Sequence, residues 1–281
     1  MSKSKIKLRY LSCQSYEIIM PNGKHLLTDP AYGEPWGKLD GYGTFTADQI
    51  EQCDYILLSH THIDHVASIK EIVKKFEPKV FLGAKVIDDM SKYMDVDYDL
   101  LYPMTEGQTI EFKDIKVTAY HFRHNHAPKS MSRTAFENRG ANENISEMEK
   151  KLNMLGSLEC LDFCVTLPNN LRLMLMAGKT ELENPYKIAQ EFRPNIVFRT
   201  MLGRWSVEHY AEVLNRYGAQ LALPHHQDAC INKHGKWTME YSELQERVSA
   251  ELDRIGSLTT YFCPEPFKWY DVDLGITLSE Q

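Results

Sequence analysis

The segment Ser59–His65, which reads SHTHIDH, holds three histidines and one aspartate within six residues. It follows the apolar run Tyr55–Leu58, which is typical of a buried strand. In an extended chain His60 and His62 project to the same side, because successive side chains alternate between the two faces. The two imidazoles can therefore reach a common metal ion.

Asp64 and His65 follow directly, and a turn after the strand brings them to a neighbouring point. Imidazole and carboxylate groups at this spacing suit zinc, or iron or manganese, better than a hydrophobic core. The alternative is a loop of solvated polar side chains, which would leave the three histidines of the segment without a common partner. The segment is therefore interpreted as a metal site.

The composition limits the class of protein. A chain of 281 residues can bury a core that needs no disulfides. Its six cysteines form no C-x-x-C pair, and the first ten residues contain basic residues but no apolar signal segment, which predicts a reduced, cytoplasmic protein. No apolar run is long enough to span a membrane. The net charge is -7 and the basic residues are scattered, which disfavours nucleic acid as a partner.

The chain begins with segments that predict an antiparallel meander of strands, followed by the strand before SHTHIDH. A helix is predicted from the capping box Ser68–Glu71 to Pro78. Further strands, one hairpin and two more helices are predicted downstream, the first helix between Ser206 and Gly218. The expected strands are residues 6–11, 15–20, 25–30, 79–83, 115–122, 161–167, 169–178, 195–200, 220–224, 258–262 and 275–278, and the expected helices include 207–217 and 239–254.

A polar segment near 127–158 interrupts this pattern. Apolar residues from Ile145 to Leu155 recur at helical spacing, and Asn144 with Glu147 resembles a capping box. Long segments of this kind are either binding elements or surface excursions without a role. The sequence therefore predicts one domain over residues 1–281, with a polar helical insertion.

Other ligands must come from later strand ends. One candidate group is His121, His124 and His126, of which one needs to be a ligand. The other is the pair His225 and His226, which follows a buried strand. Asp29 also ends an apolar strand, where it either orients a ligand histidine or caps the turn before the next proline.

At these positions the chain resembles the metallo-β-lactamase superfamily, and within it the UlaG-like branch of metal-dependent hydrolases. The resemblance covers nearly the full length and implies an α/β fold, a four-layer αββα sandwich with the site at one edge of two sheets. Cys13 or Gln14 stands where this branch usually has a histidine-containing turn. The motifs that carry the resemblance are residues 8–20, LLTDP (26–30), SHTHIDH (59–65), the strand before His124, LMLMAGKT (173–180) and LALPHHQD (221–228).

The resemblance also implies the ligands of one or two metal ions, with zinc expected and manganese or iron as alternatives. The first ion would be held by His60, His62 and His124. The second would be held by Asp64, His65 and His226.

Lys179 stands where the family has a bridging aspartate. An ammonium group cannot ligate a metal, and its charge opposes a nearby dication. Three interpretations follow. The first ion binds alone and Lys179 meets an anionic substrate group or a developing oxyanion; or Lys179 is deprotonated or carbamylated and bridges two ions; or the site is degenerate and the protein only binds or senses.

The function implied by the resemblance is metal-dependent hydrolysis of a small, anionic substrate such as a lactone, an amide or a phosphate ester. Asp64 would orient the attacking water and accept its proton, and Lys179 would assist catalysis. The alternative is a non-catalytic protein that binds a metal or ligand on the same scaffold. Neither nucleic acid nor a membrane is expected as a partner, and a homo-oligomer is compatible with the sequence.

Overall fold

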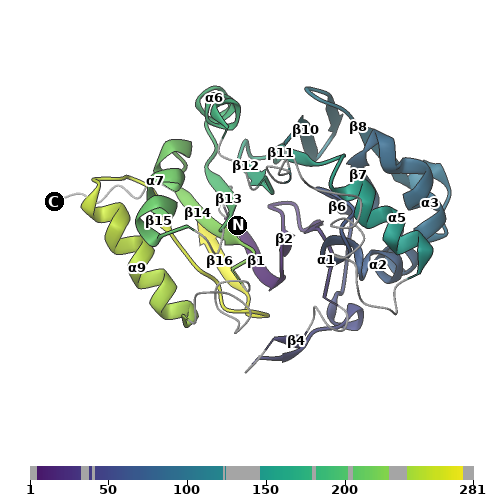
Figure 1. Cartoon of the computed structure of the whole chain (residues 1–281), viewed down its shortest axis with the longest axis horizontal. Coiled ribbons are helices and arrows are strands. Elements are labelled where there is room, and N and C mark those ends of the chain that lie inside the picture. Colours follow the sequence, from purple (N-terminus) through teal and green to yellow (C-terminus); the bar gives the residue numbers. More distant parts are fainter. Residues whose placement is uncertain are drawn as a thin grey trace, which may run out of the picture.

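The computed structural model describes residues 5–32, 38–39, 42–122, 124, 146–178, 182–201, 205–227 and 239–274. Within them, two seven-stranded sheets pack against each other and helices cover their outer faces (Figure 1). Apolar residues from both sheets, such as Tyr16 and Phe198, share one core. The predicted αββα sandwich is therefore confirmed.

The first sheet begins with the predicted antiparallel meander and continues with parallel strands. The last strand of this sheet along the chain, Tyr270–Asp273, pairs with the first. The sequence pattern did not predict this last strand. In spatial order the strands are β16 (Tyr270–Asp273), β1 (Lys5–Ser12), β2 (Ser15–Ile19), β3 (His25–Thr28), β6 (Tyr55–Leu57), β7 (Lys79–Gly83) and β8 (Leu101–Met104). A separate two-stranded ribbon joins β4 (Lys38–Leu39) and β5 (Gly43–Thr44).

The second sheet contains the predicted hairpin, formed by two antiparallel strands. Beyond it the connections become parallel, as the alternation of strands and helices predicts. In spatial order the strands are β15 (Thr260–Tyr261), β14 (Leu221–His225), β13 (Ile196–Thr200), β12 (Arg172–Met176), β11 (Leu161–Thr166), β10 (Ile115–His121) and β9 (Thr109–Phe112). The strand expected at 275–278 lies outside the described residues.

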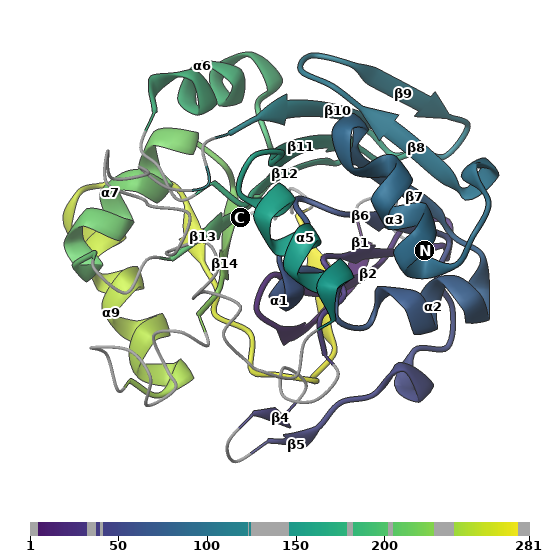
Figure 2. The same cartoon turned by 45° about the vertical axis from the view of Figure 1, so that its right-hand side comes forward.

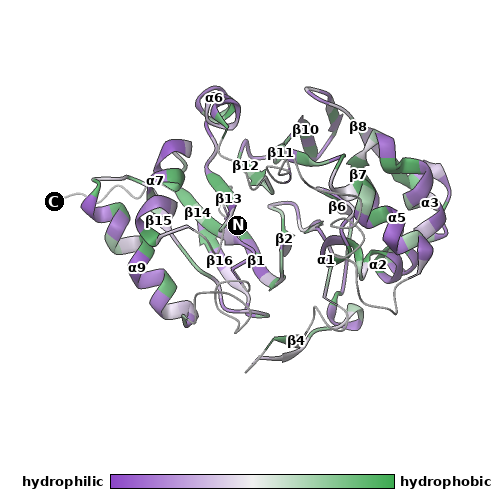
Figure 3. Ribbon diagram, in the orientation of Figure 1, coloured by the Kyte–Doolittle hydropathy of each residue, from purple (hydrophilic) through white to green (hydrophobic). Residues whose placement is uncertain are grey.

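The helices form the two outer layers. In Figure 3, β13 and β14 are mainly apolar, whereas α9 alternates between polar and apolar residues, as a helix with one buried face does. On the side of the first sheet lie α1 (Ile63–Val66), α2 (Ile69–Phe76), α3 (Ile87–Met94) and α5 (Glu147–Gly156). On the other side lie α6 (Glu183–Phe192), α7 (Val207–Tyr217) and α9 (Tyr241–Arg254). Short 3-10 turns cover Ala47–Gln49, Ala84–Val86 and Tyr98–Leu100.

The predicted ends of the helices are only partly correct. Ser206 and Gly218 cap α7 as expected. Ser68, however, makes no side-chain cap for α2, because its Oγ accepts a hydrogen bond from the backbone N–H of Tyr32 instead. The capping box of α5 is formed by Ser146 and Glu149, and the predicted Asn144 lies outside the described residues.

The strand directions determine where a site can form. Strands β3 and β6 run parallel in one sheet, and β12, β13 and β14 run parallel in the other, so their carboxyl ends meet at one edge of each sheet. Loops at such an edge are the usual place for ligands in α/β folds. In the described part of the chain, no helix has the length and apolar character needed to cross a membrane.

Candidate metal centre

Three histidines from two sheets meet at this edge. His60 and His62 follow β6, and His124 follows β10. The ring centroids of His62 and His124 are 4.3 Å apart, and those of His60 and His124 are 4.7 Å apart. One ring nitrogen from each of the three lies within 4.8 Å of the others. Three imidazoles at this separation form a donor set that suits a zinc-class ion.

Contacts with serine hydroxyl groups indicate which ring nitrogen of His60 and of His62 would bind a metal ion. The Nδ1 atom of His60 lies 2.9 Å from the hydroxyl of Ser59, so ligation would use Nε2. The Nε2 atom of His62 lies 2.8 Å from the hydroxyl of Ser157, so ligation would use Nδ1. Such contacts orient metal-binding imidazoles and select their tautomer.

A second group of donors lies beside the first, and it includes the predicted residues Asp64, His65 and His226. The Nε2 atoms of His65 and His226 are 3.4 Å apart. A carboxylate oxygen of Asp64 lies 3.7 Å from Nε2 of His65 and 3.9 Å from Nε2 of His226. The rings of His60 and His65 are 3.8 Å apart between centroids, so the two groups adjoin.

Cys13 joins this second group. Its sulfur, a carboxylate oxygen of Asp64 and a ring nitrogen of His226 all lie within 4.8 Å of one another. Cys13 stands where the resemblance implies a histidine-containing turn, and its position in the sequence alone does not identify it as a ligand. Cysteine thiolate, carboxylate and imidazole are all zinc ligands.

Asp29 has the contacts expected of an orienting residue. Its Oδ2 atom lies 3.0 Å from Nδ1 of His65, and the same oxygen accepts a 2.6 Å hydrogen bond from the Ser59 hydroxyl. Its other oxygen accepts from the backbone N–H of Ser59 at 2.7 Å. One buried carboxylate thus connects histidines of both groups, through Ser59 to His60 and directly to His65.

The backbone at the site adopts conformations that residues with a side chain rarely use. The φ angles are 48° at Cys13, 37° at Asp29 and 54° at His226. Each such conformation costs about 1–3 kcal/mol and persists where the surrounding structure imposes it. The backbone N–H of His226 donates a 2.8 Å hydrogen bond to the carbonyl of Cys13, which links two of these positions.

The structure also separates the alternative histidines. His121 is exposed and pairs with Glu106 and Glu159 rather than with the histidine group. His225 packs in the core beside Tyr16, with the ring centroids 5.5 Å apart. Burial, with smaller effects from His65 and Arg199, lowers the pKa of His225 to about 3, which keeps this imidazole neutral. His126 lies outside the described residues.

Helix α5, which comes from the predicted insertion, packs against the loop of residues 59–65, which contains His60 and His62 (Figure 2). The carbonyl of Leu152 accepts a 2.8 Å hydrogen bond from the Thr61 hydroxyl, and the side-chain oxygen of Asn153 accepts from the backbone N–H of Ile63 at 2.8 Å. A Cβ atom at Gly156 would lie 2.6 Å from the backbone nitrogen of His62. Only glycine allows this close approach.

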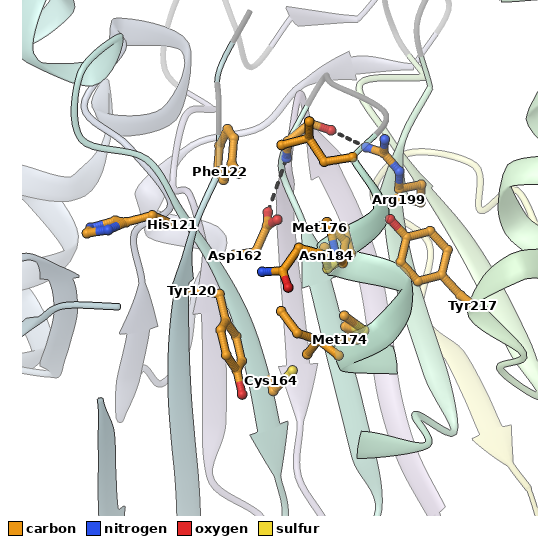
Figure 4. A pocket seen from close by; sticks show the side chains of 14 residues that line it. Tyr120, His121, Phe122, Asp162, Cys164, Met174, Met176, Asn184, Arg199 and Tyr217 are labelled. Atoms are coloured by element: carbon orange, nitrogen blue, oxygen red, sulfur yellow. Dashed lines mark hydrogen bonds between the residues drawn. The ribbon is translucent and has the colours of Figure 1, made fainter. Parts of the chain in front are cut away.

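The turn that precedes Lys179 is held by a buried acid and a buried base. The backbone N–H of Gly178 donates a 3.1 Å hydrogen bond to Asp162, and the carbonyl of Gly178 accepts one from Arg199 (Figure 4). Both side chains line a pocket between the second sheet and α6, together with Tyr120, Met174 and Tyr217. Among the described residues that line this pocket, none belongs to the two donor groups. Lys179 itself lies outside the described residues.

Burial raises the pKa of Asp162 to about 7, although the nearby Arg199 guanidinium and the backbone N–H groups of Gly178 and Ala177 act in the opposite direction. This carboxyl group is therefore partly protonated near neutral pH. Asp162 and Arg199 were not identified from the sequence, because a polar residue within an apolar strand gives no local sign of its partner. The same holds for Ser157, which is separated from His62 by 95 positions in the chain.

Known proteins resemble this chain in sequence over part of its length and in fold over nearly all of it. Residues 25–143 match the family model of the beta-lactamase superfamily domain. A protein named as a UPF0173 metal-dependent hydrolase from Koribacter versatilis is 29% identical over 120 residues, which cover 42% of this chain and 48% of the relative. The matched part thus spans about half the length of that relative.

Two solved structures share the fold. Igni18, a metallo hydrolase from the archaeon Ignicoccus hospitalis, superimposes with a TM-score of 0.68 at 12% identity and covers 97% of this chain and 100% of its own. YhfI, a metallo-beta-lactamase fold protein from Bacillus subtilis, gives a TM-score of 0.58 at 11% identity, with 96% of this chain and 100% of its own covered. The partial family match and the shared fold together show that the chain has the metallo-β-lactamase fold.

Proposed function

We propose that the chain is a metal-dependent hydrolase of the UlaG-like branch, acting on a small, anionic substrate. The observation that carries the proposal is the meeting of His60, His62 and His124 beside the group of Asp64 and His226, at one edge of the sandwich. Zinc is the expected ion, because imidazole and carboxylate ligands in a small buried group suit it. The relative from Koribacter versatilis that is named a metal-dependent hydrolase supports the same reaction class.

The residues of the chain divide the work between binding and proton transfer. When bound, a zinc-class ion lowers the pKa of a coordinated water from 15.7 towards about 7 and polarises the bond that is to be broken. His60, His62 and His124 would hold the first ion, while Asp64, His65 and His226 would hold a second. Asp64 is partly exposed, with 25% of its side chain accessible, so it can accept a proton from the attacking water.

Lys179 is proposed to hold the anionic part of the substrate. The clamp on Gly178, made by Asp162 and Arg199, fixes the backbone of the residue that precedes it. An ammonium group at this point in the chain favours a carboxylate or phosphate group on the substrate. Candidate substrates are therefore lactones, amides or phosphate esters that carry a negative charge.

The proposal is tested with a panel of charged and neutral lactones, amides and phosphate esters, before and after treatment with a chelator. We expect hydrolysis that chelation abolishes, that added zinc restores, and that His62→Ala eliminates together with metal binding. His209→Ala, which changes a histidine on α7, is the matched control and should retain both. A metal-loaded wild-type protein that hydrolyses no compound on the panel would instead support the non-catalytic alternative.

The role of Lys179 is tested separately. Lys179→Met should raise KM for anionic substrates about tenfold, the equivalent of one lost ion pair, and leave neutral substrates unchanged. Lys187→Met removes an exposed lysine from the first turns of α6 and should change neither value. An equal effect of Lys179→Met on neutral substrates would contradict anion binding.

The cytoplasmic location and the homo-oligomer stay predictions.

A further inference from the structure

Cys13 lies in the second donor group, beside Asp64 and His226. No local sequence motif marks it as a ligand. We propose that Cys13 is a thiolate ligand of a second metal ion, shared with Asp64 and His226. This inference rests on the proposed function for the presence of a metal centre, and it adds a ligand that the family resemblance does not supply. Cys13 is buried, with 2% of its surface exposed, so its sulfur faces the donor group rather than bulk solvent.

The group of Cys13, Asp64 and His226 combines three kinds of zinc ligand. Sulfur, carboxylate oxygen and imidazole nitrogen come from three separate segments, after β1, after β6 and after β14, and lie within 4.8 Å of one another. His65 lies next to this group, with its Nε2 atom 3.4 Å from Nε2 of His226. Three protein donors, with one position left for water or substrate, are the usual set of a catalytic zinc site.

The negative charge that Cys13 and Asp64 can offer also suits a divalent ion. The resemblance implies a bridging aspartate where this chain has Lys179, and an ammonium group supplies no anionic ligand at that position. A thiolate at Cys13 and the carboxylate of Asp64 again supply two negative charges to a divalent ion. The chain thus retains the charge that a second ion requires, from a different loop.

The backbone directly connects two of the three donors, Cys13 and His226. Cys13 and His226 both have left-handed φ angles, 48° and 54°, and a 2.8 Å hydrogen bond joins the N–H of His226 to the carbonyl of Cys13. This bond couples the loop after β1 to the loop after β14. The two side chains are consequently presented to Asp64 by one connected piece of backbone.

The thiolate also restricts which ion can bind. Thiolate ligands select zinc or iron over manganese and magnesium, which prefer oxygen. We therefore expect the second position to take zinc or ferrous iron, while manganese binds it poorly.

The experiment uses the full chain, stripped of metal and reconstituted with cobalt(II). A cobalt–thiolate bond gives a charge-transfer band in the near ultraviolet that imidazole and carboxylate ligands do not give. We expect the wild type to bind about two ions per chain and to show this band, and Cys13→Ala to bind about one ion and to lose it. Cys53→Ala removes another buried thiol, in the core beneath the first sheet, and should keep both ions and the band.

A second variant separates ligation from packing. Cys13→Asp places a carboxylate where the thiolate stood, and aspartate tolerates the left-handed conformation better than most residues. It should bind about two ions without the band, even if Cys13→Ala folds poorly. A wild type without the band, or a band that persists in Cys13→Ala, would overturn the proposal.

The two proposals fail in different ways. A thiolate band in a protein that hydrolyses nothing on the panel supports the role of Cys13 and contradicts the hydrolase. Chelator-sensitive hydrolysis without the band supports the hydrolase and contradicts the role of Cys13.

Discussion

The hydroxyl of Ser157, just after α5, lies 2.8 Å from Nε2 of His62 in the loop of residues 59–65. This contact leaves Nδ1 as the ring nitrogen that faces the donor group. The segment that the sequence shows as a polar insertion therefore contributes directly to the orientation of a proposed ligand.

Ser157→Ala should lower metal affinity about 10–100-fold, because the His62 ring loses the partner that fixes its tautomer and orientation. Affinity is measured by competition with a chromophoric chelator. Ser146→Ala, which removes the cap at the other end of α5, is the control: it should cost about 1 kcal/mol of stability and leave metal affinity unchanged. Equal metal affinity in Ser157→Ala and the wild type would contradict the orienting role.

Gly156→Ala should displace α5 from the metal-binding loop. The added Cβ would lie 2.6 Å from the backbone nitrogen of His62 and 2.7 Å from its ring, so helix or loop must shift. We expect a lower melting temperature and weaker metal binding, both of which calorimetry with and without zinc records. Met154→Ala, two residues away and 46% exposed, should change both values little. A Gly156→Ala protein with wild-type stability and affinity would show that the close contact is easily relieved.

His124→Ala should remove an ion, whereas His121→Ala should not. The ring of His124 lies 4.3 Å from that of His62, while His121 is exposed and pairs with Glu106 and Glu159. The measurement is metal content per chain by mass spectrometry after reconstitution. The assignment fails if His121→Ala loses as much metal as His124→Ala.

Asp162 should make the metal-free protein less stable as the pH rises. Its folded-state pKa, raised from 3.8 to about 7, lies above the unfolded value, so the unfolded chain releases the proton first. The stabilising effect is complete below pH 3.8 and declines as the pH rises to about 7. Between pH 5 and 8 the linkage relation gives a loss of about 2–3 kcal/mol as an upper estimate.

Urea unfolding at pH 5 and pH 8 tests this, with a chelator present so that metal binding does not contribute. Asp162→Asn keeps an oxygen that can accept from the N–H of Gly178 but cannot titrate, so its stability should change less between the two pH values. The prediction concerns the difference between wild type and variant, because other groups titrate in both. An identical pH dependence in the two proteins would rule out Asp162 as the source.

Local patterns in the sequence were sufficient for the order of the elements and for the types of donor. Three features depend on residues close in the chain: the apolar run before His60, the alternation of strands and helices after residue 194, and the caps Ser206 and Gly218. The αββα sandwich, expected from the family resemblance, is also confirmed. The single domain over 1–281 and the assignment of individual ligands stay predictions. The choice of His226 over His225 came from the family resemblance, because both histidines follow the same buried strand.

Tertiary structure decided what depends on distant contacts. Cys13 lies 213 positions before His226 in the chain, and only the pairing of their loops brings the thiol into the donor group. For the same reason, the Ser68 hydroxyl accepts a hydrogen bond from the backbone N–H of Tyr32 and does not cap α2, and Asp29 contacts both Ser59 and His65. A short polar side chain satisfies whichever buried group the fold places beside it, and its own sequence neighbours do not specify that group.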